Sequence, residues 1–165
     1  MESLIGLLRV QIIRGVNLAF RDTRGSDPYV VLRFGGQEVK TSVKKSNANP
    51  EWNDHLTLSI SEPLEPIKLQ VYDKDTFSRD DKMGDAEFDI RSFLEAMRTD
   101  LSRIRNGAII TTVKPCNENF LARESTIMWK DGKVVQDLVL RLRNVESGEV
   151  ELQLTWVNIP GAPGS

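Results

Sequence analysis

The chain has 165 residues, 39% of them hydrophobic and 28% charged, with a formal net charge of −2 at pH 7. This length suits one domain that buries about 70% of its unfolded surface. No apolar run reaches the roughly 20 residues of a membrane span, and the charge argues against general nucleic-acid binding. The single cysteine, Cys116, rules out a disulfide within the chain. Residues 1–6 lack the basic segment of a secretory signal, so we expect a cytoplasmic protein.

Short runs of alternating apolar and polar residues, separated by turn signals, predict an all-β fold. In the first run, Leu8, Val10 and Ile12 alternate with Arg9 and Gln11, as in a strand with one buried face. Hairpins of such strands would close into an antiparallel sandwich of two packed sheets. Eight strands are predicted, at residues 8–12, 29–34, 39–45, 56–60, 67–71, 86–90, 138–142 and 150–156.

Residues 91–133 do not follow this alternation of apolar and polar residues. They are expected to form an insertion within one domain that spans residues 1–157. Residues 108–113 are expected to add a strand, and Asp131-Gly132 to turn a hairpin into the next one. Residues 158–165 are expected to be a flexible tail. A helix that packs on the sandwich and ends near residues 106–107 is also predicted, from the helical spacing of Ile90, Phe93, Leu94, Met97, Leu101 and Ile104.

Aspartates are concentrated in two loops. The first loop carries Asp22 and Asp27, and the second carries Asp73, Asp75 and Asp81. Counting strands alternately up and down places both loops at the same end of the sandwich. Ca²⁺ prefers about six to eight hard oxygen ligands, which carboxylates supply. Any one of these aspartates could be a turn former or a solvated charge, but the whole set predicts a Ca²⁺ pocket.

Two known acidic motifs fit the second loop less well. An EF-hand loop would need a ligand and then a glycine where the chain has Phe77 and Ser78. The Asp73-x-Asp75 pair also matches a phosphatase motif of the haloacid dehalogenase type, but that fold is α/β and few helices are predicted here. Catalysis is not expected, because His55 is the only histidine and the lone cysteine has no base beside it in sequence.

Three motifs resemble the signature of C2 domains. They are SDPYV at residues 26–30, NPEWN at residues 49–53, and YDKD at residues 72–75 followed by Asp81 and Gly84. Because the first acidic loop follows the first strand, the strand order resembles the second of the two C2 permutations. The insertion and the ending GEVELQLTW are similar, more particularly, to the plant C2-domain abscisic-acid-related proteins.

This resemblance implies a non-enzymatic adaptor that binds phospholipid when Ca²⁺ is present and recruits abscisic acid receptors to the plasma membrane. It further implies a protein that is peripheral on that membrane, with oligomers on the membrane and the nucleus as further possibilities. Asp80 is expected to be only a solvated neighbour of the site. The metal ligands implied by the family motif are the side chains of Asp22, Asp27, Asp73, Asp75 and Asp81 and the carbonyls of Arg21 and Lys74.

Lipid contacts are expected from two kinds of residue. Phe77, at the crest of the second acidic loop, would enter the lipid interface and contribute about 1.5–3 kcal/mol at most. Lys40, Lys44 and Lys45 correspond to a second, phosphoinositide-type site of C2 domains, which Glu38 is expected to weaken.

The insertion is expected to bind protein partners. Phe120, Met128 and Trp129 are the large apolar residues there that the helical pattern does not explain, so they are predicted to contact a receptor or a G protein. Packing on the sandwich is the alternative for these three. Two other functions stay open: a Ca²⁺-independent protein-binding module, and a GTPase activator that uses Arg91, Arg98, Arg103, Arg105 or Arg123.

Overall fold

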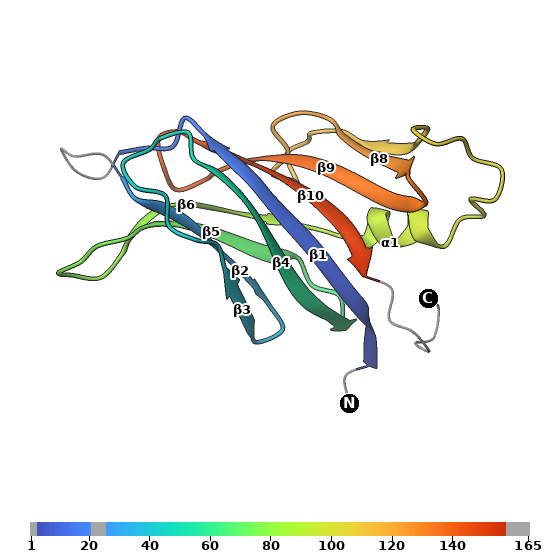
Figure 1. Cartoon of the computed structure of the whole chain (residues 1–165), viewed down its shortest axis with the longest axis horizontal. Helices are drawn as coiled ribbons and strands as arrows, with labels where there is room; N and C mark the ends of the chain where they lie inside the picture. Colours follow the sequence, from blue (N-terminus) through green and yellow to red (C-terminus); the bar gives the residue numbers. More distant parts are fainter. Residues whose placement is uncertain (1–2, 21–25, 158–165) are drawn as a thin grey trace.

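The computed structural model describes residues 3–20 and 26–157, which form two antiparallel sheets packed face to face (Figure 1). The larger sheet has the order β4-β1-β10-β9-β8-β7 and the smaller one β3-β2-β5-β6. The predicted all-β sandwich is therefore confirmed. The elements are β1 (Ser3–Val16), β2 (Pro28–Phe34), β3 (Gln37–Lys40), β4 (Glu51–Glu62), β5 (Ile67–Asp73), β6 (Asp81–Phe88), α1 (Arg91–Met97), β7 (Ile109–Val113), β8 (Ser125–Lys130), β9 (Lys133–Arg141) and β10 (Glu149–Val157).

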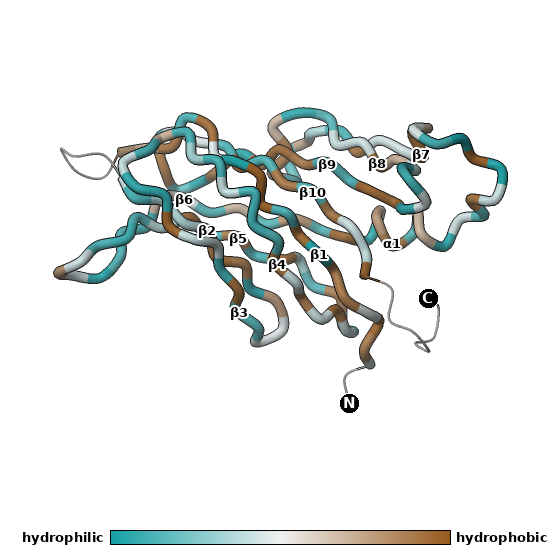
Figure 2. The backbone as a smooth tube through the Cα atoms, in the orientation of Figure 1, coloured by the Kyte–Doolittle hydropathy of each residue, from teal (hydrophilic) through white to brown (hydrophobic). Residues whose placement is uncertain are grey.

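The hydrophobic core lies between the two sheets. Leu8, Val10 and Ile12 of β1 are fully buried, and Val30 and Leu32 of β2 are buried opposite them. Along β1, buried residues alternate with more exposed ones from Ile5 to Ile12, because successive side chains point to opposite faces. Figure 2 colours this strand by hydropathy and shows both brown and teal stretches along it. Within the described residues, no helix has the length and apolar character of a membrane span.

The insertion adds two strands to the eight: β7, which matches the strand predicted at residues 108–113, and β8, for which no range was predicted. β7 pairs with β8, and β8 continues into β9 through a tight turn. At that turn Asp131 and Gly132 have positive φ angles of 51° and 77°, which this kind of hairpin requires. The predicted strand at residues 108–113 and the predicted turn are both confirmed.

The helix is shorter than predicted. α1 spans only Arg91–Met97, and its buried face packs on the sandwich as expected. The amides of Arg98 and Thr99 bond to carbonyls three residues back, at 3.1 and 3.2 Å, and this tighter spacing ends the helix. Leu101 and Ile104 therefore lie in the loop that follows α1, and Leu101 still packs partly against the core.

The third strand also ends earlier than predicted, at Lys40 instead of residue 45. The side chain of Thr41 accepts the amide of Val30 at 2.9 Å, and the amide of Lys44 donates to the carbonyl of Pro28 at 3.1 Å. These bonds take the place of the regular backbone hydrogen bonds of a β-sheet, and residues 41–50 form a loop. Consequently, two of the predicted lipid-binding lysines lie in a loop and not on a strand.

Asp85 of β6 ties the smaller sheet to the loop of residues 142–148 in the larger one. Its backbone bonds in both directions with Arg143, at 3.1 and 2.8 Å. Its carboxylate accepts Arg143 Nε at 2.6 Å and Asn144 Nδ2 at 2.9 Å. Burial works to raise the pKa of Asp85, but these bonds outweigh it and hold the pKa below its usual value. The Arg143 guanidinium also lies 4.8 Å from the ring centroid of Phe120, so the insertion is attached at the same point.

We expect Asp85→Asn to lower the free energy of unfolding by about 1–2 kcal/mol at pH 7. Because the folded-state pKa is lowered, the carboxylate stabilises the fold above its unfolded pKa of about 3.9, and the gain is lost as pH falls through the folded pKa. Urea unfolding of wild type and variant should therefore show a difference that is constant between about pH 7 and pH 5 and shrinks as the pH falls below about 4. A difference that does not shrink below about pH 4 would contradict the assignment.

Gly84 of β6 allows the 142–148 loop to approach closely. It has a φ of +106°, and a Cβ there would lie 2.5 Å from Val145 Cγ1 and 3.0 Å from Leu142 Cβ. Gly107 has a similar φ of +87° but nothing within 4 Å of that position. Gly84→Ala should therefore cost about 2–4 kcal/mol of unfolding free energy, and Gly107→Ala only about 1 kcal/mol. Equal losses in urea titrations would argue against close packing at Gly84.

Candidate functional site

Three loops meet at one end of the sandwich, on the left in Figure 1 and away from α1. They comprise the described parts of residues 17–27, together with residues 41–50 and 74–80. Asp27 connects all three, because its carbonyl accepts the amide of Lys74 at 3.0 Å and its Oδ1 accepts the amide of Ser46 at 2.8 Å. The first acidic loop is thus bonded to both others through one residue.

The motifs that resemble the C2 signature pack against one another beneath these loops. Trp52 is 4% exposed, and its Nε1 donates to the carbonyl of Pro28 at 3.2 Å. The amide of Asn17 donates to Asn49 Oδ1 at 2.8 Å. The NPEWN segment is therefore structural, and it supports the loop that carries Asp27.

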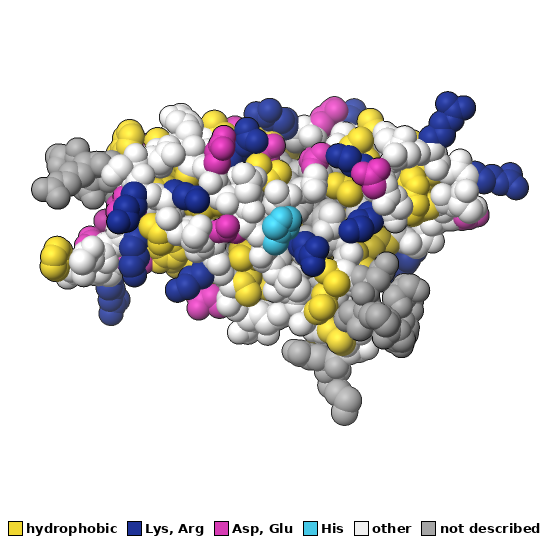
Figure 3. Space-filling model, in the orientation of Figure 1, with side chains coloured by type: hydrophobic (Ala, Val, Ile, Leu, Met, Phe, Trp, Pro, Cys, Tyr) yellow, Lys and Arg dark blue, Asp and Glu magenta, His cyan; other side chains and the backbone are white. Residues whose placement is uncertain are grey.

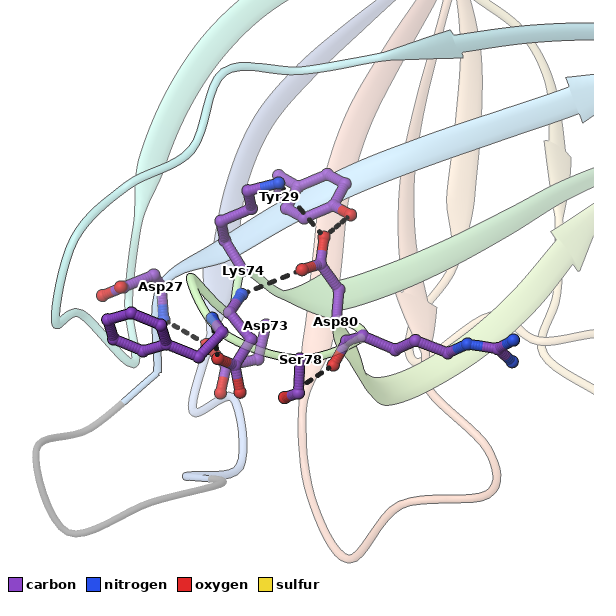
Figure 4. Close-up of polar contacts among 9 residues, drawn as sticks. Asp27, Tyr29, Asp73, Lys74, Ser78 and Asp80 are labelled. Atoms are coloured by element: carbon purple, nitrogen blue, oxygen red, sulfur yellow. Dashed lines mark hydrogen bonds and ion pairs between the residues drawn. The ribbon is translucent and has the colours of Figure 1, made fainter.

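Asp73 ends β5 at the base of the loops and is only 4% exposed. Its Oδ1 accepts the amide of Asp27 at 2.8 Å (Figure 4). In the smaller sheet it lies between two register partners, Pro28 of β2 and Asp81 of β6. Burial of a carboxylate is costly unless donors or a cation compensate, so this side chain marks the polar centre of the loop end.

Asp75 lies further along the same loop. Its Oδ1 accepts the amide of Phe77 at 3.0 Å. Hydrogen bonds from the Phe77 amide and from the side chain of Ser78 lower the pKa of Asp75, so it is a carboxylate at neutral pH. Asp81, the first residue of β6, is exposed.

Asp80 is not a solvated neighbour, so that expectation was wrong. Its side chain is 17% exposed, and its Oδ2 accepts the hydroxyl of Tyr29 (Figure 4). Its Oδ1 accepts the amide of Asp75 at 2.9 Å, and Lys74 Nζ lies 3.8 Å from Oδ2. The bonds from Tyr29 and Asp75 lower the pKa of Asp80. Sequence spacing could not show this, because Tyr29 is 51 residues away on another strand.

The predicted calcium ligands that the structure describes have suitable oxygen atoms but are not gathered into one close group. Within residues 3–20 and 26–157, no three acidic, histidine or cysteine side chains lie close enough to hold a metal ion. Two predicted ligands, Arg21 and Asp22, lie outside the described residues. The others offer the hard oxygen atoms that Ca²⁺ prefers, and all lie on or beside the loops: Asp27, Asp73, Lys74, Asp75 and Asp81.

Apolar side chains project from each of the three loops. Phe77, predicted at the crest of its loop, is 97% exposed. Phe20 is 59% exposed on the first loop and Val43 is 39% exposed on the 41–50 loop. Phe20 and Val43 were not predicted from the sequence, because single apolar residues in loops carry no periodic signal. Figure 3 shows hydrophobic and basic side chains side by side at this end of the molecule.

The three predicted lipid-binding lysines fall into two places. Lys40 is exposed on β3, opposite Val31 of β2. Lys44 and Lys45 lie in the 41–50 loop, at the end that carries the aspartates, with Lys44 partly buried. The structure therefore does not bring them together as one basic strand face.

The predicted partner residues of the insertion differ in exposure. Phe120 and Trp129 are partly buried and pack against the core. Met128 lies opposite Ile109 in the β7–β8 pair, and Ile109 is 58% exposed. Among these three residues, only Met128 is paired with an exposed apolar neighbour.

The C2 domain family model matches residues 6–104. Protein C2-DOMAIN ABA-RELATED 4 of Arabidopsis thaliana is 57% identical over 164 residues, which is 99% of this chain and 93% of the relative. The chain belongs to the C2-domain ABA-related family. A rice relative of this C2 domain (Oryza sativa subsp. japonica), named GTPase activating protein 1, is 55% identical over 161 residues, 98% of this chain and 97% of the relative.

Solved structures place this ABA-related chain in the same fold. A C2 domain of plant Extended Synaptotagmin 1 matches with a TM-score of 0.58 at 21% identity, over 94% of this chain and 99% of that one. The calcium-bound pair of C2 domains of Extended-Synaptotagmin 2 matches with a TM-score of 0.63 at 23% identity, over 94% and 47% of the two chains. At these identities the likeness shows the C2 fold alone.

Proposed function

We propose that this C2 domain is a Ca²⁺-dependent adaptor that docks on anionic phospholipid membranes through its three-loop end. One observation carries this proposal: the hydrogen bond from the Asp27 amide to the buried Asp73 carboxylate, which holds two acidic loops together. Each of the three loops also carries an exposed apolar side chain. An acidic site that must bind an acidic surface needs a cation between them, and the donor set suits Ca²⁺.

The carboxylates at this end of the sandwich would have different roles in binding the ion. Asp73 is fixed at the base, while Asp75 and Asp81 lie nearer the solvent. Bound Ca²⁺ would supply positive charge and open coordination positions for lipid phosphate. Each ion adds two positive charges, so one ion cancels the formal net charge of −2. We place Asp27 and the carbonyl of Lys74 in the same ligand set, together with the predicted Asp22 and Arg21.

Lipid contacts would follow from the exposed side chains. Phe77 would enter the interface and contribute about 1.5–3 kcal/mol. Lys44 and Lys45 would add electrostatic attraction of about 1 kcal/mol each at an anionic surface. Lys40 would form a separate basic site on the sheet. Glu38 beside it is bonded to Arg33 at 2.7 Å, which offsets its negative charge.

Asp73→Asn should abolish Ca²⁺-dependent co-sedimentation with vesicles of phosphatidylserine and phosphatidylcholine, because it removes the central charge while keeping the side-chain shape. Phe77→Ser should weaken vesicle binding about tenfold or more and leave Ca²⁺ binding in solution unchanged. The matched control is Asp100→Asn, an exposed aspartate after α1. If wild type sediments equally well in Ca²⁺ and in chelator, the proposal fails.

We further propose that the insertion binds the protein partner. The loop after α1 and the β8–β9 turn lie at the far end of the molecule from the three loops (Figure 1), where a docked domain would face the cytosol. Ile109 offers an exposed apolar side chain there, paired with Met128, and the partly buried Phe120 and Trp129 remain predicted contacts. The family resemblance points to an abscisic acid receptor, and the name of the rice relative to a G protein.

The double variant Ile109→Ser, Met128→Ser should weaken association with an abscisic acid receptor about tenfold or more, because it removes the apolar pair. Ca²⁺-dependent vesicle binding should not change. Leu4→Ser is the matched control, since Leu4 is 61% exposed on β1, outside the insertion. Receptor binding that survives the double variant but is lost with a loop variant would move the partner site to the calcium end.

A further inference from the structure

Tyr29 is held rigidly on the outer face of the smaller sheet. Its ring stacks on Tyr72 of the neighbouring strand, with centroids 5.6 Å apart and planes inclined at 23°. Arg33 donates to the Tyr72 hydroxyl at 3.3 Å, and its guanidinium lies 5.9 Å from the Tyr72 ring centroid. Glu38 of β3 holds Arg33 in turn, at 2.7 Å. Side chains from three strands therefore fix the position of the Tyr29 hydroxyl.

This hydroxyl reaches the second acidic loop through Asp80. Tyr29 donates to one carboxylate oxygen of Asp80, and the other oxygen accepts the amide of Asp75 at 2.9 Å (Figure 4). Lys74 Nζ is 3.8 Å from the same carboxylate. Asp80, at the end of the 74–80 loop, is thus bonded both to Asp75 near the start of that loop and to Tyr29 on the sheet. Its two oxygens are both engaged by protein donors.

We propose that Tyr29 and Asp80 are positioning residues, which set the backbone at Asp75 and so the place at which its carboxylate meets the ion. This inference rests on the proposed calcium site, but it assigns no ligand role to either residue. A preformed loop lowers the ordering cost of binding, because the loop does not have to be fixed when the ion arrives. Tyr29 lies opposite Tyr72 in the pairing of β2 with β5. The sheet is therefore the fixed part of the structure, and the loop is bonded to it.

Hydrogen exchange in chelator tests the loop restraint without any metal. Tyr29→Phe keeps the stacked ring and the Asp80 charge but removes the bond. It should raise amide exchange in residues 74–80, and at Asp75 above all, by about five- to tenfold. Tyr72→Phe is the matched control, since it also loses one hydroxyl on this face but leaves the bond to Asp80. Unchanged exchange in Tyr29→Phe would overturn the proposal.

Calorimetric Ca²⁺ titration without lipid tests the consequence for binding. Tyr29→Phe should weaken Ca²⁺ affinity about fivefold, with a melting temperature in chelator close to that of Tyr72→Phe. Asp80→Asn can keep both contacts through its amide, so its affinity should lie nearer to wild type than that of Asp80→Ala. Faster exchange with unchanged affinity would overturn the positioning role. If wild type binds no Ca²⁺, the calcium site fails, and the exchange data alone decide whether this pair orders the loop.

Discussion

The register of the smaller sheet is the constraint on which the loop end depends. It sets Pro28, Asp73 and Asp81 side by side on three adjacent strands. A shift of one residue would turn Asp73 to the outer face and bring Tyr72 into the core. Fully buried Val71, two residues before Asp73 on the same face, makes such a shift costly. The core therefore determines where the carboxylates lie, and the loops only complete the site.

Much of this arrangement could be predicted, because it follows from periodicity and topology. Alternating residues locate the strands, and counting them places the acidic loops at one end. Features that depend on contacts between distant residues could not be predicted. The third strand ends at Lys40 because the Thr41 side chain bonds to Val30, and Asp80 is engaged because Tyr29 lies beside it in space. Both partners belong to β2, and neither spacing nor composition reveals them.

The two ends of the molecule have different characters. At one end, carboxylates, lysines and single exposed apolar residues are mixed on loops that are bonded to one another. At the other, the insertion extends the larger sheet and covers its core with α1. Because the strands connecting these ends are long and share one core, the two surfaces keep a fixed relative orientation. The proposed membrane surface and the proposed partner surface would therefore face in opposite directions at a fixed angle.

The attachment of Phe120 to Arg143 has a consequence for how such a fold can change over time. The insertion cannot be removed without affecting the rest of the fold. Its Phe120 contacts Arg143, and Arg143 also bonds to Asp85 and so connects the two sheets. Removing the segment would leave that arginine without its aromatic neighbour and would expose β9 as a bare edge. Such edges invite pairing with other chains. Lineages that shorten this region would therefore have to rebuild an edge strand at the same time, which favours retention of the insertion as a whole.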